Sequence, residues 1–300
     1  MRNLLLTTLF IFCAIFVHAQ GFYVQPGVSY LTSATSEVLG PKVGNALTPG
    51  SEINGTLSGS YGGGLGLDLG IGYMLSRNFG IDLGVSYVLG SDVLTEEATQ
   101  GSDFDRSYAT NRRLTLSPAF IVDAGSETLS PFARFGIIAP VAGQTNGLRE
   151  SNNGTLVVGE LINFLYPDGV DKFEAESIAK GKPTLGFTAA FGLRYQLNEK
   201  ISVLGSIGYT GLRIHRNTYE VTRADVTLPD GSTESVLSVL SLDDTYIYTE
   251  YFEEVDTQAL TAHQTAADYN YGSKDFPAWE TDQGVSFSTL NISIGARFSF

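Results

Sequence analysis

The chain has 300 residues, of which 17% are charged and 11% aromatic, and its formal net charge is −14. This acidic balance argues against nucleic acid as a partner, because the phosphate backbone is bound by Lys and Arg. The share of charged residues is also low for a water-exposed surface, where about 25–35% are charged.

The first residues predict export. Arg2 supplies a positive charge, and the apolar run from Leu4 to Val17 is too short for a membrane-spanning helix of about 20 residues. Val17-His18-Ala19 then offers the residues that a signal peptidase reads, so we expect a secretory signal peptide over 1–19, cut before Gln20. The alternative is a buried N-terminal helix. Cys13, the only cysteine, lies in the apolar run, so the mature chain would contain none.

A period-two alternation of bulky apolar and small or polar residues recurs along the rest of the chain. The clearest pair spans residues 61–74 and 79–89, on either side of a short turn at Ser76-Arg77-Asn78. Such alternation predicts β-strands with two chemically different faces. The other segments of this kind lie at 22–30, 114–122, 131–141, 185–197, 201–209 and 290–300, which makes eight in all.

The connections between these segments alternate between short and long. Short turns lie around Arg77, Gly125 and Asn198, and long loops lie near 33–59, 92–107, 142–183 and 213–284. Each segment is also close to the length of a tilted strand that crosses a bilayer, roughly 9–11 residues. The pattern predicts an all-β fold, a closed antiparallel transmembrane β-barrel of eight strands over 20–300. Both termini would lie in the periplasm, and the long acidic loops would be extracellular.

The small-residue face indicates which side of the barrel points outward. A soluble barrel alternates too, but its water-facing side would carry more charge than the Gly, Ser, Thr and Ala found here. The bulky apolar face therefore meets lipid, where a closed sheet avoids unpaired backbone groups. Aromatic residues near the strand ends can form interfacial belts: Tyr30, Tyr73, Phe79, Tyr87, Tyr195, Tyr209, Phe298 and Phe300.

The long loops contain predicted elements of their own. Residues 170–180, with Asp168 as a possible cap and Gly181 as a stop, predict a short helix. Residues 219–228 and 236–252 flank Pro229-Asp230-Gly231 and predict a hairpin. Its faces mix apolar and charged residues, so we expect it to project beyond the membrane. A barrel of ten spanning strands that includes this hairpin is the alternative.

The C-terminal segment Leu290–Phe300 (LNISIGARFSF) resembles the C-terminal signal of outer-membrane barrels, with alternate apolar residues and a terminal Phe. In those proteins the ending implies recognition by the barrel-assembly machinery, so Phe298 and Phe300 are the expected assembly signal. Together with the export signal and the loop pattern, it makes the mature chain similar to the small outer-membrane β-barrel domain family of OmpA- and OmpX-type proteins. Pro26 and Pro118 depart from the pattern, because a proline within a strand removes a ladder N–H.

A sparse set of charged residues falls on the small-residue face, where it would point into the lumen. The set comprises Asp68, Asp82, Arg134, Arg194 and Arg297. An eight-stranded barrel is just wide enough for side chains to fill, and charges inside it must be paired. We therefore predict a luminal ion-pair cluster that plugs the barrel. A path that attracts anions is the alternative, because Arg is in excess.

Signals for catalysis and for metal binding are weak. The mature chain would have only His215 and His263, and neither has a recognisable nucleophile at the spacing of barrel enzymes. Asp103, Asp105 and the acidic stretch 253–256 offer oxygen ligands that suit calcium, but no Asp-x-Asp-x-Asp-Gly spacing supports a site. We expect no enzyme, no cofactor and no metal site.

The sequence thus predicts an integral protein of the bacterial outer membrane with a structural or surface-interaction role. Its expected partners are outer-membrane lipid, the barrel-assembly machinery during biogenesis and an extracellular protein or polysaccharide, and not nucleic acid. A small channel for a modest solute is the alternative function.

Overall fold

The computed structural model describes residues 21–35, 37–44, 53–126, 128–153, 166, 168–239, 248–252, 278–281 and 284–300. The expected signal peptide, the acidic stretch 253–256 and His263 lie outside these residues. Within the described part, no helix is long and apolar enough to cross a membrane.

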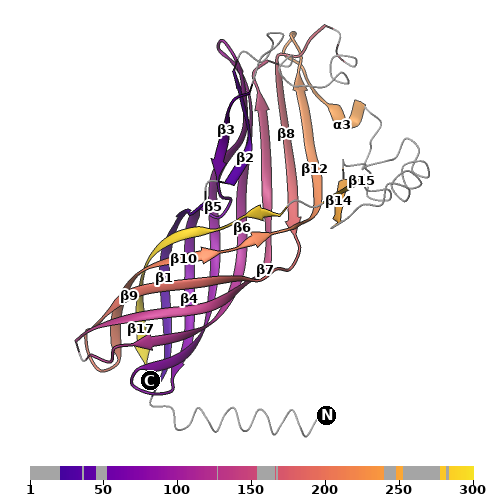
Figure 1. Ribbon diagram of the computed structural model, residues 1–300. Helices are drawn as coiled ribbons and strands as arrows, with labels where there is room; N and C mark the ends of the chain where they lie inside the picture. Colours follow the sequence, from indigo (N-terminus) through magenta and orange to yellow (C-terminus); the bar gives the residue numbers. More distant parts are fainter. Residues whose placement is uncertain are drawn as a thin grey trace, which may run out of the picture.

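Eight antiparallel strands form a closed ring in the order β1-β4-β5-β6-β7-β9-β10-β17, and β17 pairs with β1 (Figure 1). Closure runs from Tyr23 opposite Ser299 to Ser33 opposite Thr289. The predicted eight-stranded barrel is confirmed, and the ten-stranded alternative is not formed. The strands are β1 Phe22–Ser33, β4 Gly64–Met74, β5 Phe79–Gln100, β6 Asp103–Asp123, β7 Leu129–Ser151, β9 Gly186–Gln196, β10 Ile201–Gly211 and β17 Thr289–Ser299.

The two faces of the ring differ as the alternation predicts. Large apolar side chains are exposed on the outside, for example Leu67 at 48%, Leu83 at 44% and Phe187 at 56%. Hydroxyl side chains such as Thr115 and Ser202 are buried on the inside. An apolar outside around a polar inside is the reverse of a soluble barrel and suits a lipid environment.

Two prolines interrupt the pairing of ring strands on one side only. Pro26 is in register with Leu69 of β4, while the pairing of β1 with β17 is broken beside it. Pro118 is in register with Leu83 of β5, while the pairing of β6 with β7 is broken beside it. Because proline has no N–H, each of these two strands stays paired with one neighbouring strand at the proline and is locally unpaired from the other.

Three ring strands continue beyond one end of the ring and form the centre of an upright sheet, here called the extension sheet (Figure 1). These strands are β5, β6 and β7. Inside the ring β7 pairs with β9, and above the ring it pairs with β8. Among the residues predicted as long loops, those that the structure describes are therefore largely strands. The sheet adds β8 Lys172–Gly181, β12 Arg216–Thr227, β13 Thr233–Ser235, β14 Tyr248–Phe252 and β15 Ala278–Thr281 on one side, with β2 Glu37–Gly44 and β3 Ile53–Gly59 on the other.

The short helix predicted over residues 170–180 is wrong. Residues 172–181 form strand β8, which is hydrogen-bonded to β7 on one side and to β12 on the other. Its small or apolar positions Phe173, Ala175, Ser177 and Ala179 recur every second residue. Neighbouring strands on both sides satisfy its backbone groups, so tertiary pairing outweighs the local helical signals at Asp168 and Gly181.

The hairpin predicted around Pro229-Asp230-Gly231 is confirmed in part. Strands β12 and β13 pair across the turn, with Thr227 opposite Thr233, and Gly231 has a φ of 84° that favours glycine. Residues Val236–Val239, however, form the short helix α3, and it is β14 that pairs with the earlier part of β12. The hairpin belongs to the extension sheet and not to the ring.

The contacts of Phe300 predict that it matters for assembly of the ring. Its backbone N donates to Phe22 O at 3.0 Å, and the two rings lie 5.8 Å apart where β1 meets β17. Deleting Phe300 is expected to lower the yield of folded barrel, measured by heat-dependent electrophoretic mobility. The exposed ring of Phe135 lies away from this contact, so Phe135→Ala should largely preserve the yield. Equal yields from the two variants would contradict an assembly role.

Candidate functional site

The interior of the ring is the candidate functional site. Turns next to Ser76, Gly125 and Asn198 lie at one end, together with both ends of the described chain (Figure 1). We call this the short-turn end. The extension sheet rises from the opposite end, which we call the sheet end.

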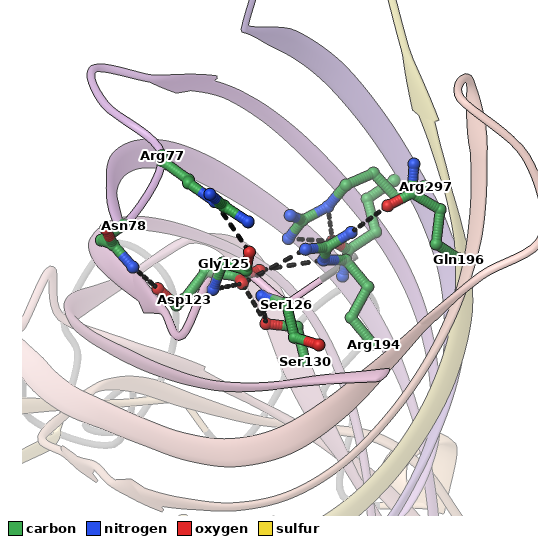
Figure 2. Close-up of polar contacts among 10 residues, drawn as sticks. Arg77, Asn78, Asp123, Gly125, Ser126, Ser130, Arg194, Gln196 and Arg297 are labelled. Atoms are coloured by element: carbon green, nitrogen blue, oxygen red, sulfur yellow. Dashed lines mark hydrogen bonds and ion pairs between the residues drawn. The ribbon is translucent and has the colours of Figure 1, made fainter. Parts of the chain in front are cut away.

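A polar network crosses the lumen at the short-turn end (Figure 2). Asp123 is only 2% exposed and accepts hydrogen bonds from Arg194 Nε at 2.9 Å and Nη2 at 3.2 Å. It also accepts from the Ser130 hydroxyl and from the backbone N of Gly125 at 2.8 Å. A carboxylate that takes four such bonds is fully compensated although it is buried.

The turn that follows Asp123 is fixed by side chains of the neighbouring turn (Figure 2). Arg77 Nε donates to Gly125 O at 2.8 Å, and Asn78 Nδ2 donates to Asp123 O at 2.9 Å. Gly125 has a φ of 74°, which favours glycine. These contacts hold the Asp123 carboxylate toward the lumen.

Arg297 occupies the lumen beside this network. Its guanidinium lies 4.1 Å from the centroid of the Tyr23 ring and donates to Gln25 Oε1 at 3.1 and 3.2 Å. The buried Tyr23 ring fits because Gly72 faces it, where a Cβ would lie 2.2 Å from the tyrosine oxygen. We call the four residues that lie at this end of the ring the polar closure: Asp123, Ser130, Arg194 and Arg297.

A second ion pair lies further inside the ring. Arg134 Nε donates to Asp82 Oδ1 at 2.9 Å, and its Nη2 donates to Ser117 O at 3.0 Å and Oγ at 2.9 Å. Gly84 leaves room for this arginine, because a Cβ there would lie 2.5 Å from Nη2. A polar cavity of about 150 Å³ remains beside the pair, lined among others by Asp68, Arg113, Thr188, Ser206 and Thr210.

The residues predicted as one luminal cluster do not form a single network. Asp82 and Arg134 are partners, but Arg194 is bound to Asp123, which the prediction omitted. Asp68 lines the cavity and has no ion-pair partner among the residues that the structure describes. The missed Asp123 continues the buried, inward positions 115, 117, 119 and 121 of β6 by one more step. Extending the predicted strand by one residue beyond 122 would have found it.

An apolar cluster lies at the sheet end of the ring. Five of its side chains are less than 10% exposed, and the rings of Tyr61 and Phe287 lie 5.8 Å apart. Residues 285–288 are anchored here, because Phe287 N donates to Leu212 O at 2.8 Å and β16 (Val285–Ser286) pairs with β11 (Arg213–Ile214). We call this cluster the apolar closure: Tyr61, Ala109, Ile138, Leu212 and Phe287.

A cleft of about 540 Å³ lies between the apolar closure and the extension sheet. The extension sheet contributes small residues such as Gly147 and Ala175 to its lining together with the Tyr219 ring, and the apolar closure adds the rings of Tyr61 and Phe287. Small-molecule sites have volumes of about 300–1,000 Å³, so the cleft is of ligand size. A second apolar cluster packs against the same sheet: Tyr166, Val170, Phe173, Ala224, Val226 and Val236.

Acidic side chains of the extension sheet are held in ion pairs. Glu97 contacts Lys42 at 2.9 Å and Arg106 at 3.0 Å, and these two hydrogen bonds hold the pKa of the Glu97 carboxyl below its usual value. Arg149 binds both oxygens of Asp105, and this bond raises the pKa of the guanidinium. The pairing neutralises part of the acidity that the sequence places in these segments.

The sequence candidates for metal binding and catalysis lie apart. Asp105 is bound to Arg149, and Asp103 accepts a hydrogen bond from Asn153 Nδ2 at 2.7 Å. His215 lines the cleft. In the described part of the chain, no group of three or more His, Cys, Asp or Glu side chains could hold a metal ion.

Several solved structures of outer-membrane proteins are similar to this chain. Neisserial surface protein A is 10% identical with a TM-score of 0.37, covering 93% of this chain and 97% of its own. A major outer membrane protein from Thermus thermophilus is 13% identical with a TM-score of 0.41, covering 94% and 100%. Ail, the attachment invasion locus protein of Yersinia pestis, is 8% identical with a TM-score of 0.33, covering 94% and 99%.

No curated protein matches the sequence. A family model, in contrast, matches residues 5–229, which is well over half of the chain, and it describes the outer membrane protein beta-barrel domain. The location that this family implies is the bacterial outer membrane, which agrees with the apolar outer face of the ring. The chain therefore belongs to the outer membrane protein beta-barrel domain family.

Proposed function

We propose that this protein is a closed outer-membrane barrel that presents the extension sheet at the cell surface, and that it acts through surface contacts and not as a pore or an enzyme. The observation that carries the proposal is the presence of buried, mutually packed side chains at both ends of the ring. Asp123 and Arg194 block the short-turn end, and Phe287 with its neighbours blocks the sheet end. A solute would have to displace both sets of side chains.

The proposed orientation places the sheet end outside the cell and the short-turn end in the periplasm. Barrels of the bacterial outer membrane have short periplasmic turns and longer extracellular loops. Here the short turns and the ends of the described chain share one end of the ring. Export would use the signal peptide over 1–19, and insertion would use the barrel-assembly machinery with Phe298 and Phe300 as its signal.

The cleft is the part of the surface that we propose contacts an extracellular polysaccharide or protein. It combines aromatic rings, such as Tyr219 and Phe287, with charged groups, such as Glu96 and Arg149. Ligand sites of this size pair an apolar lining with a small number of polar groups that fix orientation. The ion pairs of the extension sheet hold its strands in position around the cleft.

The cavity of about 150 Å³ inside the ring favours a second candidate function, passage of a small solute. In that case the closures would open during transport. The two candidates differ in whether reagents reach the lumen of the folded barrel.

Labelling of single cysteines tests the proposal. Cys13 is the only cysteine in the sequence and lies in the proposed signal peptide, so introduced cysteines report alone. On intact cells, a membrane-impermeant maleimide should label Ala179→Cys in the cleft. Lys200→Cys at the short-turn end should react only after cell lysis. Ser206→Cys in the luminal cavity should react only after denaturation. Fast reaction of Ser206→Cys in the folded barrel would support the channel instead.

A further inference from the structure

Arg113 is a buried cation that has no counter-charge in contact among the residues that the structure describes. It lies on the inward face of β6 beneath the apolar closure and is 3% exposed. Nη2 donates to Gly62 O at 3.4 Å, and the guanidinium lies 5.5 Å from the centroid of the Phe287 ring. Nε and Nη1 have no hydrogen-bond partner in the described part of the chain. A buried guanidinium in this state is strongly disfavoured unless an acceptor completes it.

Other unpaired polar groups lie close to Arg113. Asn111, two residues earlier on the same inward face, has a buried Nδ2 without an acceptor. The Thr289 hydroxyl is also buried and unpaired. Thr289 and Arg113 meet at Gly62, where a Cβ would lie 2.5 Å from Thr289 Cγ2. The unpaired nitrogens of Arg113 and Asn111 can only donate, and the described part of the chain supplies no acceptor for them.

The luminal carboxylates do not meet this need by direct contact. Asp82 is bound to Arg134, and Asp123 is bound to Arg194. Asp68 lines the same cavity as Arg113, but it is in register with Ser86, two residues along β5 from the position that faces Arg113. Among the described charged residues that line this cavity, Asp68 is therefore the one acid and Arg113 the one base without an ion-pair partner, and space separates the two.

We propose that this cavity binds a small inorganic anion of chloride size at Arg113. A monovalent anion supplies both the missing charge and several acceptor directions, whereas a water molecule supplies no charge. The cavity of about 150 Å³ accommodates such an ion with some water, since one water-sized probe needs about 10–15 Å³. Thr188 and Thr210 line the cavity and offer further hydroxyl donors. This step rests on the proposed closed lumen, in which the ion would be trapped as the barrel folds.

The site is tested on the whole barrel refolded into detergent in sodium chloride, sodium bromide or sodium gluconate at equal ionic strength. We expect a higher Tm in chloride and bromide than in the bulky gluconate. Arg113→Gln should abolish this difference. Arg112→Gln changes the adjacent but exposed arginine on the other face, so it should keep the difference. Should Arg113→Gln fail to fold, Arg113→Lys retains the charge and should keep the preference for halide.

Crystals grown in bromide provide a readout that needs no variant. An anomalous peak within hydrogen-bond distance of Arg113 would establish the site, and bromide peaks confined to the outer surface would overturn it.

The variant Asp68→Asn distinguishes a bound anion from a direct ion pair between Asp68 and Arg113. If an anion is bound, removing this acid should widen the halide difference. If Asp68 itself compensates Arg113, the variant should lower the Tm equally in every salt, and the proposal fails.

Discussion

Replacing Arg194 with alanine is expected to lower the free energy of unfolding by about 3–5 kcal/mol, because it leaves a buried charge without its partner. The charge is that of Asp123, which is 2% exposed. Ser130 and Gly125 would still donate to the carboxylate, but they carry no positive charge. Urea unfolding of the barrel in lipid vesicles measures the change. The matched control is Lys200→Ala, which removes one cation at an exposed position of a short turn. It should change the free energy of unfolding little.

A double-mutant cycle shows whether this loss belongs to the pair. Asp123→Ala combined with Arg194→Ala should be less destabilised than the sum of the single variants, because no charge remains unpaired in the double variant. A loss of about 1 kcal/mol or less from Arg194→Ala is typical of an exposed ion pair. That result would contradict a dry polar closure.

Replacing Phe287 with alanine is also expected to cost about 3–5 kcal/mol, since truncating a buried ring removes its contacts and leaves a cavity. The ring is 4% exposed and packs against Tyr61 in the apolar closure. Phe135→Ala removes an exposed ring from the outer face and is the control in the same unfolding experiment. Equal losses would show that Phe287 is not packed as described.

The two closures lie in series along the lumen, which predicts a specific pattern of ion conduction. Arg194→Ala removes part of the polar closure but leaves the apolar closure, and Phe287→Ala does the reverse. We therefore expect neither single variant to conduct and the double variant to give discrete current steps. Conduction by either single variant alone would mean that the other closure does not seal the lumen.

The ring could be predicted from the sequence because lipid and lumen impose opposite chemistry on alternate residues. Leu67, Leu83 and Phe187 are all exposed as the alternation requires. The number of strands followed from the same signal, since each alternating segment became one ring strand. Even Pro26 and Pro118 are compatible with ring strands, because at each of these positions the strand stays paired with one neighbouring strand.

The extension sheet was less predictable, because its strands owe their form to neighbours that are distant in sequence. Strand β8 has local signals of a helix, yet β7 and β12 pair with it along most of its length. The apolar closure was missed for a similar reason. Tyr61 was assigned to a spanning segment, Phe287 lay between the last predicted loop and the last predicted segment, and only the fold brings these rings together.

The candidate site could be predicted in part. The phase of the alternation placed charges inside the ring, but it does not determine which charges meet across the lumen. Arg194 reaches Asp123 because β9 and β6 are both neighbours of β7 in the ring. Arg113 was not singled out, because it lies just before the predicted segment that begins at residue 114.

The measurement that tests the closed lumen most directly is the current through the wild-type barrel in a planar lipid bilayer. The proposed filling of both ends by buried side chains predicts no steady open-channel current, at a protein density where the Arg194→Ala/Phe287→Ala double variant shows clear steps. A wild-type barrel that conducts steadily, with variants that change only its ion selectivity, would contradict the account and establish the protein as a channel.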